Sequence, residues 1–459
     1  MDDHPQNRTS RRTLGDTIAA IATPPGQGGV GVVRVSGPLT PALAQQLLGT
    51  LPAPRRARYG AFRNANGKVL DHGLALFFPA PHSFTGEDVL ELHAHGSPVV
   101  LDWLLETLTQ GGARLARPGE FSERAFLNDK LDLVQAEAIA DLIASHSRAA
   151  AQAALLSLEG LFSTQINQLV AQLIQLRVLI EAALDFSDEA VDWLTPASLQ
   201  QQLGQLRTLL NQLQHSAQQG RLLREGLTVV IAGPPNAGKS SLINALSGRD
   251  VAIVTPQAGT TRDVLREPVN LDGLPLILLD TAGLRASEDA VEQEGMRRAH
   301  TALERADHVL WMVAAPSVPE TDAATLDLPE SLRTRPYTLL RNKIDCTGES
   351  PQLYSLSEGH CVLSLSVQTG AGLDLLRQHL KHLAGYQPSE GVFLARRRHL
   401  EALRQAEAAM LRAETQVDGL PELLAEELYQ AQRALSQITG AFTADDLLGA
   451  IFSTFCIGK

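Results

Sequence analysis

The chain has 459 residues, of which 44% are hydrophobic and 20% charged, and a formal net charge of −12. This length exceeds what one hydrophobic core supports and predicts about three domains, and the acidic balance argues against a protein that coats nucleic acid through charge alone. The three scattered cysteines form no C-x-x-C pair, so the sequence indicates neither a disulfide framework nor a zinc site. Since it also lacks a signal peptide and a long apolar run, we expect a cytoplasmic protein without membrane contact.

The N-terminal part is predicted to be an α+β domain. Residues 1–14 are expected to form a disordered extension, and from 15 to 128 Gly and Pro interrupt short β-rich runs such as GVGVVRVSG and DVLELHAHG. Such punctuation is typical of strands joined by turns. One helix is expected here, near SPVVLDWLLETLTQGG.

In the rest of the chain, segments with a helical sequence pattern lie on both sides of an α/β unit. Residues 129–224 and 388–459 contain few helix breakers, and leucine, alanine and glutamine recur at helical spacing, as in packed helices. Between them, in 225–387, short apolar strands alternate with helical stretches, which indicates a doubly wound parallel sheet. The simplest topology inserts an α/β, Ras-like P-loop G domain in an all-α helical bundle domain.

A phosphate-binding loop is indicated by GPPNAGKS, residues 233–240, which matches G-x-x-x-x-G-K-[ST]. The motif lies after an apolar strand and before a helix, the context that a P-loop requires. In such a loop Lys239 contacts the phosphates and Ser240 can ligate Mg²⁺. Downstream, Asp280 of DTAG ends an apolar run, where its carboxylate can hold Mg²⁺ through water, and Gly283 lets its amide meet the γ-phosphate.

The base is predicted from NKID, residues 342–345, which follows the apolar segment YTLLR. A carboxylate at Asp345 can accept both N1–H and N2–H of guanine, which adenine does not offer, so GTP is the expected nucleotide. Ser366, Val367 and Gln368 occupy the place of a further base-contacting motif, where backbone contacts are expected. The predicted nucleotide-binding residues are Gly233, Asn236, Ala237, Gly238, Lys239, Ser240, Ser241, Thr255, Thr260, Thr261, Asp280, Thr281, Ala282, Gly283, Asn342, Lys343, Asp345, Ser366, Val367 and Gln368.

Activation of the attacking water requires an unusual solution in this chain. The residue after the DTAG motif is Leu284, whose side chain cannot orient water as the glutamine of Ras does. Asn236 and the segment TPQAGTTRD, residues 255–263, suggest a replacement. An amide oxygen and loop carbonyls could hold a monovalent cation beside the phosphates, and Thr261 would complete the Mg²⁺ shell with Ser240.

The motifs GPPNAGKSS, AGTTRD, DTAGLR and NKID and the terminal FCIGK together resemble the MnmE (TrmE) family of bacterial tRNA-modification GTPases. The match covers nearly the whole chain. The resemblance implies a homodimer whose two G domains meet across their nucleotides and whose GTPase activity is stimulated by K⁺. The implied K⁺ ligands are Asn236, Thr255, Gln257 and Thr260. Glu292 falls on the family position that orients the attacking water, and it forms the implied catalytic set of the G domain with Asn236 and Lys239.

The resemblance also implies a tetrahydrofolate-binding and dimerisation domain at the N-terminus, with a pocket completed by the C-terminal tail. We expect the tail to be a docked lid, with Phe455 and Ile457 buried; the alternative is a helix end tucked against the core. Cys456 is either a catalytic thiol that traps a one-carbon unit or a buried structural thiol. The implied folate residues are Arg34, Glu91, Lys130 and Lys459.

The family's reaction implies further partners. It requires an FAD-dependent protein of the MnmG (GidA) family, in a heterotetramer or larger complex, with tRNA bound largely through that partner. The product is an aminomethyl or carboxymethylaminomethyl group at C5 of the wobble uridine, with its methylene carbon from 5-formyl- or 5,10-methylene-tetrahydrofolate.

Two alternatives remain at this level. One is a nucleotide-state switch GTPase that acts on another RNA or ribosome-assembly partner without folate chemistry. The other is a folate-dependent, aminomethyltransferase-like enzyme regulated by its G domain. Separately, the basic run Arg396, Arg397 and Arg398 is better explained as a solvated helix face than as a tRNA contact.

Overall fold

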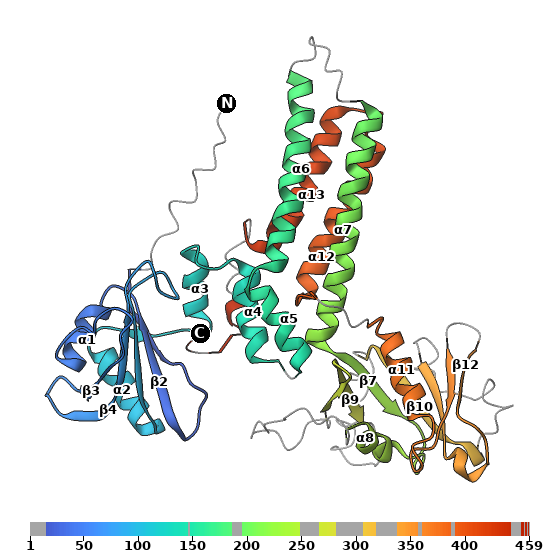
Figure 1. Cartoon of the computed structure of the whole chain (residues 1–459), viewed down its shortest axis with the longest axis horizontal. Helices are drawn as coiled ribbons and strands as arrows, with labels where there is room; N and C mark the ends of the chain where they lie inside the picture. Colours follow the sequence, from blue (N-terminus) through green and yellow to red (C-terminus); the bar gives the residue numbers. More distant parts are fainter. Residues whose placement is uncertain are drawn as a thin grey trace, which may run out of the picture. The chain divides into compact units, whose positions relative to one another are not determined.

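The computed structural model describes residues 15–145, 147–185, 195–247, 266–280, 306–317, 337–356, 360–386, 391–441, 451–453, 455–456 and 458. The predicted extension 1–14 lies outside them. Two compact units make up the chain, one formed by Met1–Ala140, Ser157–Leu206 and Gln405–Lys459, the other by Asp141–Leu156 and Arg207–Arg404; Figure 1 labels their helices and strands. In the part of the chain that the structure describes, no helix combines the length and apolar character needed to span a membrane.

The first unit begins with a six-stranded sheet in the order β3-β4-β5-β2-β1-β6. Its neighbours are antiparallel, except for the parallel pair β1 and β6. Side chains alternate along a strand, so Val33 and Leu92 pack in the core with the helices, while Arg34 and Glu91 point to the opposite face. The elements are β1 (Ile18–Ile21), β2 (Gly28–Ser36), α1 (Thr40–Leu48), β3 (Arg58–Arg63), β4 (Val69–Phe78), β5 (Val89–Gly96), α2 (Pro98–Gln110), β6 (Arg114–Leu115) and α3 (Glu120–Leu127).

The predicted single helix of this domain is confirmed as α2, but the structure adds α1 and α3. No helix was expected over PLTPALAQQLLG. Pro41 occupies the first turn of α1, where a proline gives up no helical hydrogen bond. Gly49, with φ +73°, ends that helix in the left-handed region. Proline therefore marks a helix start here and not a loop.

Helices precede and follow the strands of the second sheet along the chain. They are α4 (Leu133–Ile143), α5 (Arg148–Leu158), α6 (Leu161–Asp185), α7 (Pro196–Glu225), α12 (Arg397–Thr415) and α13 (Pro421–Thr439). In the first unit α6 and α13 run side by side (Figure 1), and Arg177 donates to Gln432 across them at 2.6 Å. In the second unit Gln214 of α7 donates to the carbonyl of Leu403 in α12 at 3.2 Å.

The second unit contains a seven-stranded sheet in the order β12-β13-β11-β10-β7-β9-β8. The five inner strands are parallel, and the edge strands β12 and β8 are antiparallel to their neighbours. One face packs with apolar residues of α8 and α11, including Leu242 and Leu376. The elements are β7 (Leu227–Ala232), α8 (Lys239–Ser247), β8 (Arg266–Leu271), β9 (Leu274–Asp280), β10 (His308–Ala314), η1 (Ala315–Ser317), β11 (Tyr337–Asn342), η3 (Ile344–Cys346), β12 (Gln352–Ser355), β13 (Cys361–Ser364) and α11 (Leu373–Leu383).

The predicted fold class is confirmed in all three parts. An α+β domain opens the chain, helices follow, and an α/β sheet lies in sequence between α7 and α12. Because α7 leads directly into β7 and the chain returns to α12 after α11, the α/β domain is an insertion in the helical one.

Candidate functional site

The phosphate loop runs from the end of β7 to the start of α8. Its backbone enters the left-handed region at Gly233 (φ +139°), Asn236 (φ +60°) and Gly238 (φ +105°). A Cβ at Gly233 would lie 2.1 Å from the carbonyl oxygen of Met312, and one at Gly238 would lie 2.3 Å from Nδ2 of Asn342. Only glycine fits at these two positions, and the loop leads into the N-terminus of a helix, where backbone amides favour phosphate.

The polar side chains of this loop lie at the start of α8. Lys239 donates through Nζ to the carbonyls of Gly233 at 2.8 Å and Pro234 at 2.9 Å, which holds its ammonium group over the loop. Ser240 and Ser241 are exposed in the first helical turn. A cation and two hydroxyls therefore lie together at the start of α8, and their roles toward phosphate and Mg²⁺ stay predictions.

The predicted base-recognition segments are joined to the phosphate loop by a direct hydrogen bond. Asn342 ends β11, donates through Nδ2 to the carbonyl of Ala237 at 2.8 Å, and accepts at Oδ1 from the amide of Val367 at 3.0 Å. The Ser366 hydroxyl donates to Asp345 Oδ1 at 2.5 Å, and this bond lowers the pKa of the Asp345 carboxyl. The structure thus brings the NKID, SVQ and P-loop segments together.

Strand register explains this convergence. Asp280, the last residue of β9, pairs with Ile231 of β7, and Asn342, the last residue of β11, pairs with Ala314 of β10. The carboxyl ends of parallel strands share one edge of a sheet, which is where ligands bind in α/β folds. Outside the described residues lie Thr255, Gln257, Thr260, Thr261, Thr281, Ala282, Gly283, Leu284 and Glu292.

A second polar cluster lies on the N-terminal sheet. Arg34 of β2 faces Glu91 of β5 in the strand register, with 2.8 Å between Nη2 and Oε1. The guanidinium carbon of Arg34 lies 5.5 Å from the ring centroid of Phe84 and 5.8 Å from that of Phe121. Arg34 also donates through Nη1 to the carbonyl of Gly458 at 3.3 Å. An ion pair, two rings and the C-terminal tail therefore meet at one arginine.

The described tail residues are docked. Phe455 is 6% exposed and packs with Phe452 and Phe126, and the amide of Gly119 donates to the carbonyl of Cys456 at 3.3 Å. A Cβ at Gly458, where φ is +92°, would lie 2.5 Å from the carbonyl oxygen of Ile21. The expected burial of Phe455 is confirmed.

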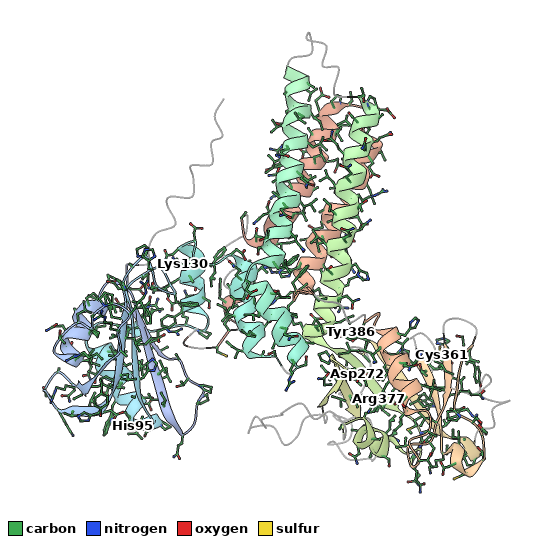
Figure 2. All side chains as sticks on the ribbon, in the orientation of Figure 1. His95, Lys130, Asp272, Cys361, Arg377 and Tyr386 are labelled. Carbon is green, nitrogen blue, oxygen red and sulfur yellow. The ribbon has the colours of Figure 1, made fainter. Side chains whose placement is uncertain are left out.

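Other predicted tail and pocket residues have mixed outcomes. Cys456 is exposed, so the alternative of a buried structural thiol is wrong. Lys130 is exposed and its stem lies beside Gly86; Figure 2 labels it near α3. Ile457 and Lys459 lie outside the described residues.

Sequence reasoning missed the residues around Arg34 and the ion-pair network behind them. Arg124, 1% exposed, pairs with Glu87 at 3.1 Å, Glu120 at 3.1 Å and Asp16 at 2.7 Å. Burial alone would raise the pKa of Glu120, but hydrogen bonds from Arg114, the amide of Arg117 and Arg124 outweigh it and lower that pKa from 4.5 to about 2. The available signal was the density of charges in RPGEFSER, which has no periodicity that predicts burial.

One arginine of the basic run 396–398, at the N-terminal end of α12, forms an ion pair within the protein. Arg396 donates through Nη2 to Asp141 Oδ1 at 2.8 Å, and Arg224 reaches the same oxygen at 2.9 Å. The Arg396 side chain is 15% exposed. Its pairing removes it from the solvated face that the sequence suggested for all three arginines.

The P-loop, its bonds to the base-recognition segments, and their shared sheet edge define a guanine-nucleotide hydrolase of the P-loop class. A family model described as "GTP-binding protein TrmE N-terminus" matches residues 17–130, and one described as "MnmE helical domain" matches residues 133–456. The chain belongs to the MnmE family of tRNA modification GTPases, and it is a GTPase that acts in tRNA modification.

Three relatives carry the same name, tRNA modification GTPase MnmE. That of Hydrogenovibrio crunogenus is 58% identical over 449 residues, which are 97% of this chain and 99% of that protein. That of Stutzerimonas stutzeri is 57% identical, with coverage of 97% and 99%. That of Nitrosococcus oceani is 56% identical over the full length of both chains. The likeness therefore extends across every domain described above.

Proposed function

We propose that this GTPase, together with an FAD-dependent partner of the MnmG (GidA) family, builds the aminomethyl or carboxymethylaminomethyl group at C5 of the wobble uridine. The observation that carries the proposal is the Arg34 cluster, because it joins an ion pair on the N-terminal sheet to the docked tail. GTP hydrolysis would move the G domains, and the helical domain would relay that motion to the folate and tRNA site.

The Arg34 cluster would bind a one-carbon tetrahydrofolate. Glu91 would offer a carboxylate to the pterin's donors, the half-buried Phe84 an apolar face, and the cations Arg34 and Lys130, with Lys459, would hold the folate's carboxylates. When bound, 5-formyl- or 5,10-methylene-tetrahydrofolate supplies the carbon. Cys456, with its exposed thiol, is the candidate nucleophile of the tail.

In the G domain, we assign Mg²⁺ to Ser240 and Thr261 and K⁺ to Asn236, Thr255, Gln257 and Thr260. Asn236 supports this assignment because it is exposed in the phosphate loop. Glu292 would position the attacking water. GTP turnover should be faster in KCl than in NaCl, and Asn236→Ala should remove the difference. Glu292→Ala should keep nucleotide affinity and slow turnover about a hundredfold; equal rates in the two salts would rule out the K⁺ site.

The proposal includes the assembly and its location. We assign the chain to a cytoplasmic homodimer that forms a heterotetramer or larger complex with its MnmG-family partner. Most tRNA contacts would belong to that partner, since this chain is acidic and phosphate binding needs a basic surface.

Nucleoside analysis tests the function as a whole. In tRNA from a strain that lacks this chain, the C5 group of the wobble uridine should be absent, and it should return with the wild-type gene but not with Arg34→Met. Unchanged C5 modification in the deletion strain would contradict the proposal. In that case a switch GTPase acting on another RNA or ribosome-assembly partner would take its place.

A further inference from the structure

Arg341 carries a charge in the middle of the G-domain sheet. It lies in β11 immediately before Asn342, and its side chain is fully buried. Burial of an arginine is costly unless its donors are paired. Nη1 donates to Glu349 Oε2 at 2.6 Å and Nη2 to Glu349 Oε1 at 3.0 Å, which is the two-pronged geometry that a guanidinium and a carboxylate form best.

The partners of Arg341 flank both segments proposed to bind the base. Glu349 follows the loop that holds Asp345, and Nη1 also donates at 3.2 Å to the hydroxyl of Ser364. Ser364 ends β13, two residues before Ser366, the residue that donates to Asp345. One guanidinium therefore ties together the two chain segments whose side chains set the position of the Asp345 carboxylate.

The strand itself does not need this side chain. Arg341 pairs with Ser364 in the register of β11 and β13, and its carbonyl accepts from the amide of Leu365 at 2.9 Å. These backbone bonds hold the sheet. The fork instead reaches the far end of the loop, whose inner turn is closed by the amide of Gly348 donating to the carbonyl of Ile344 at 2.8 Å.

We propose that the Arg341–Glu349 pair is a positioning element for guanine selectivity. It fixes both ends of the 343–348 loop, so that the Asp345 carboxylate faces N1–H and N2–H of the base. This inference rests on the base-binding role that the NKID motif predicts for Asp345.

The test compares the affinities of the intact chain for GDP and IDP, measured with fluorescent analogues. Hypoxanthine lacks the exocyclic amino group, so the ratio of the two Kd values reports the second hydrogen bond to Asp345. Glu349→Gln and the double variant Arg341→Met/Glu349→Gln should weaken GDP binding about tenfold, as expected when one hydrogen bond to a charged group is lost. Binding of IDP should weaken less, so the preference for GDP over IDP, given by the ratio of the two Kd values, should fall. The value of kcat at saturating GTP should stay unchanged.

Two further variants separate the possible outcomes. Lys381→Met breaks a pair with Asp272 in the same domain and should leave the ratio unchanged. Asp345→Ala should abolish selectivity; if it does not, the proposed base site itself fails. If Asp345→Ala behaves as expected but the Arg341 and Glu349 variants keep the wild-type ratio, weaken both nucleotides equally or fail to fold, the pair is a structural element and the inference is overturned.

Discussion

The two sheets of this protein build their sites in different ways. On the N-terminal sheet, Arg34 and Glu91 are opposite residues inside neighbouring strands, and the third contact comes from Gly458, 424 residues further along the chain. In the G-domain sheet, the phosphate loop follows a parallel strand and Asn342 ends one. The N-terminal site is built by paired charged side chains, whereas the phosphate loop is built by its backbone conformation.

The difference predicts different vulnerabilities. Charges buried in pairs stabilise a fold only while both members are present, so the N-terminal sheet should be sensitive to the loss of a charge. A loop that needs left-handed backbone should tolerate little added volume, so the phosphate loop should be sensitive to the gain of a methyl group.

The largest effect is expected for Arg124→Met in the N-terminal domain. The substitution leaves Glu87 and Glu120 buried without their common partner and should lower the free energy of unfolding by about 3–5 kcal/mol. Hydrogen exchange of the β1 and β2 peptides in the intact chain measures it. Arg117→Met, whose side chain is 57% exposed, is the control and should cost less than about 1 kcal/mol; equal costs would contradict the role of the buried pairs in this domain.

In the phosphate loop, Gly233→Ala should weaken GDP binding at least about a hundredfold, because left-handed strain and a clash with the Met312 carbonyl both displace the loop. Gly385→Ala is the control, since Gly385 has φ +61° and open space where a Cβ would lie. Calorimetric titration of GDP should show near-normal affinity for this control. Comparable losses of affinity in both variants would show that the effect of Gly233→Ala is not specific to the phosphate loop.

Acid should destabilise the N-terminal domain and the G domain in different pH ranges. Burial, His379 and His360 lower the pKa of His308 in β10 from 6.5 to about 4. Folding favours the neutral imidazole, so its contribution, about 2 kcal/mol after solvent screening, is complete above pH 6.5 and lost as pH falls toward 4.

Glu120 behaves in the opposite sense, because folding favours its ionised form. Its contribution is complete above about pH 4.5 and is lost as the pH falls toward 2. Hydrogen exchange against pH should therefore show weaker protection of β10 peptides before that of α3 peptides. Simultaneous loss of protection in both would contradict the assignment.

The sequence was sufficient for the part of the G site that short motifs encode. GPPNAGKS, Asp280 and NKID each lie at the end of a parallel strand, so that strand order alone brings them to one edge. Asn342 and Ala237 could be expected to meet because the strand-end rule applies to both.

The remaining features depend on tertiary packing that local patterns do not encode. Nothing in VVRVSG shows that Arg34 will contact Gly458, and that site was expected only from the family resemblance. Arg341 and Arg124 look like ordinary polar positions, since period-2 and period-3.6 patterns predict which residues face a core but not which charges a core will pair. Helix α1 was not predicted, and its Pro41 occupies a position that helices also accept.

The most direct test of the account is calorimetric titration of 5-formyltetrahydrofolate into the intact chain, a chain lacking residues 455–459, and Gly458→Ala. The account predicts micromolar binding to the intact chain, loss of binding on truncation, and weaker binding to Gly458→Ala, whose added Cβ cannot fit against Ile21. Equal affinity of all three chains for the folate would show that the tail takes no part in folate binding. Absence of binding to the intact chain would contradict the folate role and leave a GTPase of tRNA modification with another source of carbon.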